Sequence, residues 1–252
     1  MVIWAFIFAA VALIPIFLYQ ILIARRINKK LSKLIDSASA NRVTAKNQKE
    51  QAWQHYRQSE FYAQLLLALK PLAPIPALRS WAASPDLLLT LFHLTQKHRP
   101  RVIVDLGSGA STLVLAKAAP EAEIFSIDNS DEYANKTAEM LKDHGITHVS
   151  LRVAPLSIDG SGIEWYQREA FADISKIDLL FVDGPPGSKN STARHPAFYE
   201  LREKLSPNAI VVIDDVNRDG EMKLAQLFAE SLPSHSLEIL NHEKGTAVIK
   251  PA

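Results

Sequence analysis

The apolar and polar positions divide the chain into parts, and the first part is almost wholly apolar. Residues 1–24 carry no charged side chain, and Trp4, Pro15 and Tyr19 lie within this run. A helix of about 20 apolar residues can cross the hydrocarbon core of a bilayer. Membrane helices tolerate proline, and aromatic residues gather near their ends. The pattern predicts a transmembrane anchor over residues 1–24.

A cleaved signal peptide and a buried core helix are the alternatives for this segment. A signal peptide starts with basic residues and has an apolar part of about 7–15 residues, and neither feature is present here. The small residues 37–40 resemble a cleavage site but lie well beyond the apolar run. The anchor is therefore the favoured interpretation.

The charges that flank the apolar run predict its orientation. Basic residues follow the run and none precedes it: Arg25, Arg26, Lys29, Lys30 and Lys33. Because positive charge marks the cytoplasmic side, we expect a single-pass protein of the inner (cytoplasmic) membrane, with everything after residue 24 in the cytoplasm. The same cluster suits anionic lipid, although a topology signal explains it equally well.

Residues 25–71 have a polar helical pattern. The chain holds neither glycine nor proline from Ile16 to Lys70, and apolar residues such as Ile27, Leu31 and Leu34 recur at helical spacing. We predict a helical juxtamembrane stalk, with room for an interruption near Ala40, where large apolar residues are scarce. Assembly into a homo-oligomer through the stalk stays open, since no sustained heptad repeat supports a coiled coil.

From residue 72 onward, short apolar runs alternate with helical patterns. Strands are expected at residues 102–106, 123–127, 148–153, 177–183, 209–215, 237–240 and 246–250. Helices are expected at 85–97, 111–119, 131–143, 193–204 and 220–231. This alternation predicts an α/β domain over residues 72–252, with a doubly wound, mostly parallel seven-stranded sheet whose last two strands are antiparallel at the edge.

Composition narrows the functional classes. The chain has 252 residues, a formal net charge of +1 and no cysteine. The near-neutral balance gives no sign of a nucleic-acid partner. The absence of cysteine excludes disulfides and thiolate metal sites.

The segment "VIVDLGSGAST" carries the first candidate chemistry. Gly107 and Gly109 follow the first expected strand of the alternating region, where doubly wound sheets bind their ligands, and the next helix points its N-terminus at that place. A dinucleotide fingerprint would need glycine at Thr112. Asp105 would repel a pyrophosphate but attract an amino group or a sulfonium. Asp128, at the end of the second expected strand, suits a ribose diol.

These motifs resemble those of a known superfamily. "VIVDLGSGAST" with "IFSIDNS" is similar to motif I and the following acidic motif of class I S-adenosylmethionine-dependent methyltransferases. The segments "WAASPD", "FVDGPPG", "RHPAF" and "VVIDDVNRDGE" resemble a bacterial, membrane-anchored subgroup, over roughly residues 77–252. The resemblance implies a Rossmann-like methyltransferase fold with S-adenosylmethionine as cofactor. It also implies cofactor contacts by Trp81, Ser84, Asp105, Gly107, Ser108, Gly109, Ser111, Asp128, Asn129, Pro155 and Asp183.

Acidic residues at the ends of two later expected strands indicate where the methyl acceptor would bind. Asp183 ends "FVDG", and Asp214 and Asp215 end "VIDD". Neighbouring parallel strands bring their carboxyl ends together, and oxygen clusters suit Mg²⁺, which can lower the pKa of an acceptor hydroxyl. Catechol-type O-methyltransferases, which this region resembles, place acids there, although their second pair is commonly Asp-Asn. The predicted metal ligands are Asp183, Asp214 and Asp215.

A metal-free acceptor site is the alternative. Lys189, Arg194 or His195 would then act as a base or an acceptor clamp, and Asp183, Lys189 and His195 are the candidate catalytic residues. In a purely structural interpretation of these acids, Asp183 shapes a turn and Asp215 caps a helix.

The leading functional expectation is a membrane-anchored methyltransferase acting on a small-molecule or membrane-associated acceptor, most simply by O-methyl transfer. A nicotinamide-dependent oxidoreductase, an aminopropyltransferase and a catalytically silent membrane scaffold are the alternatives.

Overall fold

A computed structural model gives the fold. It describes the backbone of residues 2–78, 81–158, 164–187 and 190–252, and the side chains from residue 13 onward within these ranges. The chain forms two compact units, Met1–His55 and Tyr56–Ala252.

The first unit consists of one helix. Helix α1 runs without a break from Val2 to Leu69, so its last turns belong to the second unit. The expected interruption near Ala40 is wrong, because the chain has no helix-breaking residue there. Side chains also bond to the preceding turn, with Ser39 donating to the Asp36 carbonyl at 2.8 Å and Thr44 to the Ala40 carbonyl at 3.0 Å.

The structure does not support the expected membrane span. Within the described part of the chain, no helix combines the length and the apolar character needed to cross a bilayer. The transmembrane helix over residues 1–24 therefore stays a prediction from the sequence.

The end of α1 is part of the core of the second unit. Leu65 and Leu69 are buried in one apolar cluster with Leu87 and Leu88 of helix α2 (Pro85–His98). Asp86, at the start of α2, accepts hydrogen bonds from the Gln58 side chain at 2.7 Å and from the Glu243 backbone at 2.9 Å. The compact unit thus begins at Tyr56, within the segment that the pattern assigned to the stalk.

A seven-stranded sheet forms the centre of this unit. Its order is β3 (Val149–Val153), β2 (Glu123–Asp128), β1 (Val102–Leu106), β6 (Ile177–Val182), β7 (Leu205–Asp214), β9 (Thr246–Pro251) and β8 (His235–Leu240). Pairing is parallel from β3 to β7, whereas β9 is antiparallel to both of its neighbours. The predicted α/β fold with a mostly parallel sheet and an antiparallel pair at the edge is confirmed, with β9 on the inner side of the pair.

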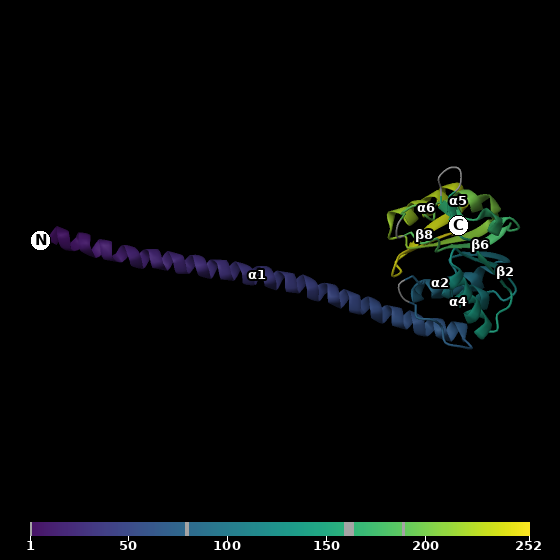
Figure 1. The fold of residues 1–252 in the computed structure, drawn as a ribbon, viewed down its shortest axis with the longest axis horizontal. Helices are drawn as coiled ribbons and strands as arrows, with labels where there is room; N and C mark the ends of the chain where they lie inside the picture. The colour runs from purple at the N-terminus through teal and green to yellow at the C-terminus, as the bar shows by residue number, and fades with distance from the viewer. Residues whose placement is uncertain (1, 79–80, 159–163, 188–189) are drawn as a thin grey trace. The chain divides into compact units, whose positions relative to one another are not determined.

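Helices cover both faces of the sheet. In Figure 1, α2 and α4 (Asp131–Asp143) lie on one side of the sheet, and α5 (Pro196–Leu201) and α6 (Asp219–Ser231) on the other. Helix α3 (Ala110–Ala118) packs against α2. Residues alternate between the two faces along β1, where Ile103 joins the cluster with α2 while Val104 and Leu106 join the one with α6.

Two elements differ from the sequence pattern. A two-stranded antiparallel ribbon, β4 (Leu156–Ile158) with β5 (Glu164–Tyr166), precedes the short 3₁₀ helix η1 (Arg168–Phe171) and was not predicted. Strands of three residues are too short for an alternating pattern to show. The helix expected over 193–204 is shorter, because a turn precedes Pro196 and the 3₁₀ helix η2 (Arg202–Lys204) follows Leu201.

Candidate active site

One cavity opens at the carboxyl ends of the central strands. It has a volume of about 930 Å³, which is in the range of ligand pockets. The loops after β1, β2 and β6 form its floor, and the extended segment 74–78 and one face of α4 form its walls. The expected position, beyond the carboxyl ends of the strands, is the observed one.

The two glycines after β1 serve different purposes. Gly107 has a φ of +102°, which strains any other residue, and a Cβ there would lie 3.3 Å from the Gly184 nitrogen, so the neighbouring loop would have to shift to admit a side chain. Gly109 has a φ of +151°, and a Cβ there would meet nothing within 4 Å. Since Gly109 lines the cavity, the missing side chain leaves space for a ligand.

Asp105 lies behind this loop rather than on the cavity wall. It is fully buried and accepts hydrogen bonds from Thr112 Oγ1 at 2.7 Å, from Ser111 Oγ at 3.2 Å and from Ser126 Oγ at 3.4 Å. Burial raises its pKa to about 7, although the hydroxyls that bond to it lower the pKa. The structure therefore gives Asp105 the role of positioning the loop and the start of α3.

Asp128 forms the polar floor of the cavity. Its Oδ2 accepts from both the backbone nitrogen of Ser108 at 3.0 Å and the Ser108 hydroxyl at 2.6 Å, and its Oδ1 accepts from the backbone of Ser130 at 2.9 Å. Thr137 of α4 donates to the Ser108 hydroxyl at 3.2 Å. This network fixes the carboxylate at the edge of the cavity.

The structure separates the predicted cofactor residues into two sets. The cavity is lined by Trp81, Gly107, Ser108, Gly109, Ser111, Asp128, Asn129 and Asp183. Asp105, Ser84 and Pro155 are not among its lining residues. Ser84 is buried at the start of α2 and donates to Asp86, and the Pro155 carbonyl accepts from the Gln167 backbone at 3.3 Å.

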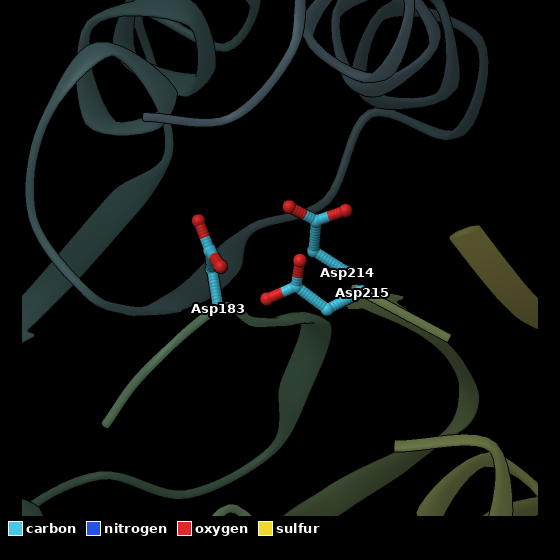
Figure 2. Close-up of side chains that lie close together, drawn as sticks. All are labelled: Asp183, Asp214 and Asp215. Atoms are coloured by element: carbon cyan, nitrogen blue, oxygen red, sulfur yellow. The ribbon is translucent and has the colours of Figure 1, made fainter. Parts of the chain in front are cut away.

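The three predicted metal ligands come together. Figure 2 shows Asp183 at the end of β6 beside Asp214 and Asp215 at the end of β7. One carboxylate oxygen from each lies within 4.8 Å of the other two. Asp215 has a φ of +64°, a left-handed conformation that aspartate adopts more readily than most residues.

Burial dominates the electrostatics of this acidic cluster. It raises the pKa of Asp214, and the nearby carboxylates of Asp183 and Asp215 raise it further. Burial also raises the pKa of Asp183, against the lowering effect of the Arg194 guanidinium. Both oxygens of Asp214 lack a hydrogen-bond partner among the described residues.

Arg194 lies inside the cluster. Its side chain is 5% exposed, and its Nη2 donates to Asp183 Oδ1 at 3.0 Å and to Asp215 Oδ2 at 2.9 Å. The carboxylate oxygens suit Mg²⁺ in kind and spacing, but the guanidinium already bridges two of the three acids. As arranged, the cluster does not fit a divalent ion.

Of the other two candidate catalytic residues, the structure describes His195, which does not line the cavity. His195 Nε2 lies 3.0 Å from the Gly220 carbonyl and is not among the lining residues, so it connects the turn before α5 to α6. Lys189 lies outside the described residues. Of the three candidates, Asp183 is the one that the structure places on the cavity wall.

Several lining residues were missed by the sequence analysis. Tyr166 of β5 is 1% exposed, and its hydroxyl has no hydrogen-bond partner in the described part of the chain. Burial raises its pKa, so the hydroxyl stays protonated and can donate to a ligand. Further lining residues are Tyr133, Met140 and His144 of the α4 region and the basic residues Arg218 and Lys244. Apart from Arg218, which lies within "VVIDDVNRDGE", no quoted motif contains them, because they come from segments that only packing brings together.

The strand order, the glycine turn and the acid after β2 are features of the Rossmann-like methyltransferase fold, and comparison with known proteins agrees. Residues 104–216 match the family model described as a methyltransferase domain. A search of curated proteins gave no match.

Solved structures share the fold. An O-methyltransferase from Bacillus cereus, in complex with S-adenosylhomocysteine, is 19% identical, with 80% of this chain and 97% of that chain covered at a TM-score of 0.55. The O-methyltransferase TomG from Streptomyces achromogenes, in complex with S-adenosylmethionine, is 19% identical, with 80% and 96% covered at 0.53. The methyltransferase PaMTH1 from Podospora anserina is 18% identical, with 68% and 80% covered at 0.52.

Proposed function

We propose that this chain transfers the methyl group of S-adenosylmethionine to a hydroxyl group of an acceptor. The observation that carries the proposal is that the glycine turn, Asp128 and Asp183 line one cavity. A nucleoside-binding side and an acidic side therefore share the same space. The two O-methyltransferases with the same fold support a hydroxyl acceptor.

The cavity residues fit the cofactor. Asp128 would accept hydrogen bonds from the ribose diol, since each carboxylate oxygen can accept more than one bond. Gly109 leaves open the space that a side chain would fill. The Tyr166 hydroxyl, which has no partner among the described residues, would donate to the methionine end of the cofactor beside Gly184.

Asp183 would act on the acceptor. When bound, S-adenosylmethionine supplies the methyl group on its sulfonium and leaves as S-adenosylhomocysteine. The acceptor oxygen would take this methyl group as the carbon–sulfur bond breaks. Asp183, on the cavity wall, takes the proton that the hydroxyl loses, and Arg194 holds this carboxylate in place at 3.0 Å.

The sheet argues against the nicotinamide-dependent alternative. The usual strand order of dinucleotide-binding sheets is 3-2-1-4-5-6, in a mostly parallel sheet. Here the antiparallel β9 lies between β7 and β8. A catalytically silent scaffold would have the same fold, so only a measurement of activity can distinguish it from an enzyme.

The test combines binding with transfer. The full chain is titrated calorimetrically with S-adenosylhomocysteine and with NAD⁺, and then incubated with methyl-labelled cofactor and a membrane extract. We expect binding of S-adenosylhomocysteine alone and a labelled product that Asp183→Asn no longer forms. Binding without a labelled product from any extract would favour the scaffold, and absence of binding would refute the proposal.

The localisation proposal rests on the sequence. The charge-free residues 1–24 and the basic residues that follow support attachment to the cytoplasmic membrane, with the enzyme domain in the cytoplasm. An acceptor made at or near the membrane would follow from that location. Fractionation of cells that express the full chain, compared with a chain that begins at Tyr56, tests this; equal recovery of both chains in the soluble fraction would contradict it.

A further inference from the structure

We infer that Arg194 is the built-in cation of the acidic cluster and excludes a divalent metal ion from Asp183, Asp214 and Asp215. The inference deepens the proposed function, on which its consequence for the acceptor rests. Its structural part stands on the contacts of Arg194 alone.

All three nitrogens of the Arg194 guanidinium donate hydrogen bonds. Nη2 bridges Asp183 Oδ1 and Asp215 Oδ2, Nη1 donates to the Asp214 backbone carbonyl at 3.2 Å, and Nε donates to the Pro185 carbonyl at 3.3 Å. Arginine keeps its charge at every physiological pH. The cluster therefore contains a permanent cation that two carboxylates and two backbone carbonyls hold in one orientation.

A metal ion would compete for the same oxygens. Mg²⁺ requires carboxylate oxygens at about 2.0–2.1 Å in a near-octahedral shell that usually keeps several waters. To bring Asp183 and Asp215 to one ion, the guanidinium that bridges them would have to leave. A buried arginine that loses its partners is strongly unfavourable.

The neighbouring charges hold the arrangement in place. Arg218 Nη1 lies 2.9 Å from the same oxygen of Asp215, so two guanidinium groups share it. Glu221 is buried and lies 3.9 Å from Arg194 Nε and 3.6 Å from Arg218 Nη1. Among the described residues, Asp214 is the acid of the three that bonds to no side chain, but it is fully buried and is not a lining residue of the cavity. On its own it gives an ion neither enough ligands nor room for waters.

This arrangement has a consequence for the acceptor. With a metal ion at the cluster, an acceptor could bind through two neighbouring oxygens that chelate the ion. With Arg194 there, the acceptor meets hydrogen-bonding groups and the carboxylate of Asp183. A molecule with a single hydroxyl can bind to these groups. The substrate class is therefore not restricted to vicinal diols such as catechols.

Manganese is the probe, because Mn²⁺ takes similar oxygen ligands and is counted directly by the electron paramagnetic resonance of the free ion. The full chain is titrated with Mn²⁺ as wild type, Arg194→Gln, Arg194→Lys and Arg218→Ala. We expect a new Mn²⁺ site in Arg194→Gln, at least about tenfold tighter than any site in the wild type. Arg194→Lys keeps a cation, and Arg218→Ala keeps Arg194, so neither should gain it.

Thermal unfolding gives a second readout. Mn²⁺ should raise the unfolding midpoint of Arg194→Gln and leave that of the wild type unchanged, because a ligand stabilises the state that binds it. The inference is overturned if wild-type protein binds Mn²⁺ and Asp214→Asn abolishes that binding. A folded Arg194→Gln that gains no site also overturns it. If Arg194→Gln does not fold, the wild-type titration decides alone.

Titration of the same wild-type sample with S-adenosylhomocysteine separates the two proposals. Failure to bind S-adenosylhomocysteine would refute the proposed function, whereas wild-type Mn²⁺ binding that Asp214→Asn abolishes would refute only the role of Arg194.

Discussion

Ser108 donates two hydrogen bonds to one oxygen of Asp128, at 3.0 Å from its backbone nitrogen and at 2.6 Å from its hydroxyl. The loop after β1 and the end of β2 are thereby joined at the floor of the cavity. The carboxylate reaches the cavity in a fixed orientation, with lone pairs left for a ribose diol.

The first prediction concerns Asp128. Asp128→Ala should weaken S-adenosylhomocysteine binding by about tenfold or more, because a hydrogen bond to a charged group contributes about 1.5–3 kcal/mol. Calorimetric titration measures it. Asp131→Ala, which removes an exposed carboxylate from the first turn of α4, is the matched control and should bind like the wild type. Equal affinity of the two variants would contradict the ribose assignment.

The second prediction separates backbone strain from cavity space. Gly109 and Gly145 both have positive φ, and a Cβ at either would meet nothing within 4 Å. Ala at Gly145 should therefore cost about 1–2 kcal/mol of stability. Ala at Gly109, whose backbone lies in a region nearly restricted to glycine, should cost about 1–3 kcal/mol. Since only Gly109 lines the cavity, only Gly109→Ala should also lose S-adenosylhomocysteine affinity. Denaturant unfolding and calorimetry measure the two effects, and an equal loss of affinity in both variants would count against the cavity assignment.

The third prediction concerns the hydroxyl of Tyr166. Tyr166→Phe should leave the free energy of unfolding unchanged or raise it, because the hydroxyl is buried without a partner among the described residues. It should nevertheless weaken S-adenosylhomocysteine binding. Tyr199→Phe, at an exposed position of α5, is the control for both measurements. Wild-type affinity in Tyr166→Phe would show that this hydroxyl does not contact the cofactor.

The fourth prediction is a pH dependence of stability that arises at Asp105. Burial raises its pKa from 3.8 to about 7, so the folded protein binds more protons than the unfolded chain between these values. The contribution of Asp105 to the free energy of unfolding therefore falls as pH rises from about 4 to about 7. Asp105→Asn removes this contribution and should gain stability relative to the wild type across the window, by up to about 4 kcal/mol.

Denaturant unfolding at several pH values measures this difference. Thr112→Val should raise the pKa of Asp105 further, because it removes the 2.7 Å hydrogen bond that lowers this pKa. The fall in the free energy of unfolding with pH should therefore be larger than in the wild type, whereas in Asp105→Asn it is absent. A constant difference between wild type and Asp105→Asn from pH 4 to pH 8 would show that the carboxylate does not titrate in this range.

The fifth prediction concerns where the folded domain begins. A chain that starts at Tyr56 should unfold at a higher denaturant concentration than one that starts at Leu72. The shorter chain lacks the buried Leu65 and Leu69, and each fully buried leucine contributes about 1.5–3 kcal/mol. It also leaves Asp86 without the Gln58 side chain that bonds to it. Equal stability of the two chains would show that the end of α1 is dispensable.

The sequence by itself determined the α/β fold and the position of the site. Apolar runs such as residues 102–106 and 123–127 predicted β1 and β2 to within a residue, because buried parallel strands need continuous apolar side chains. Gly107, Gly109 and Asp128 were found for a similar reason: a tight turn and a strand end are local features of the chain. The meeting of Asp183 with Asp214 and Asp215 followed from the parallel topology.

Tertiary structure alone decided what surrounds those residues. Nothing in the sequence says that Arg194 enters the acidic cluster, that His195 bonds to Gly220 instead, or that Tyr166 lines the cavity. Asp105 fits the motif, yet its bonds to Thr112 and Ser126 place it behind the loop. The physical reason is that the direction of a side chain depends on which distant segments pack around it, whereas apolar periodicity and turn chemistry are set by near neighbours in the chain.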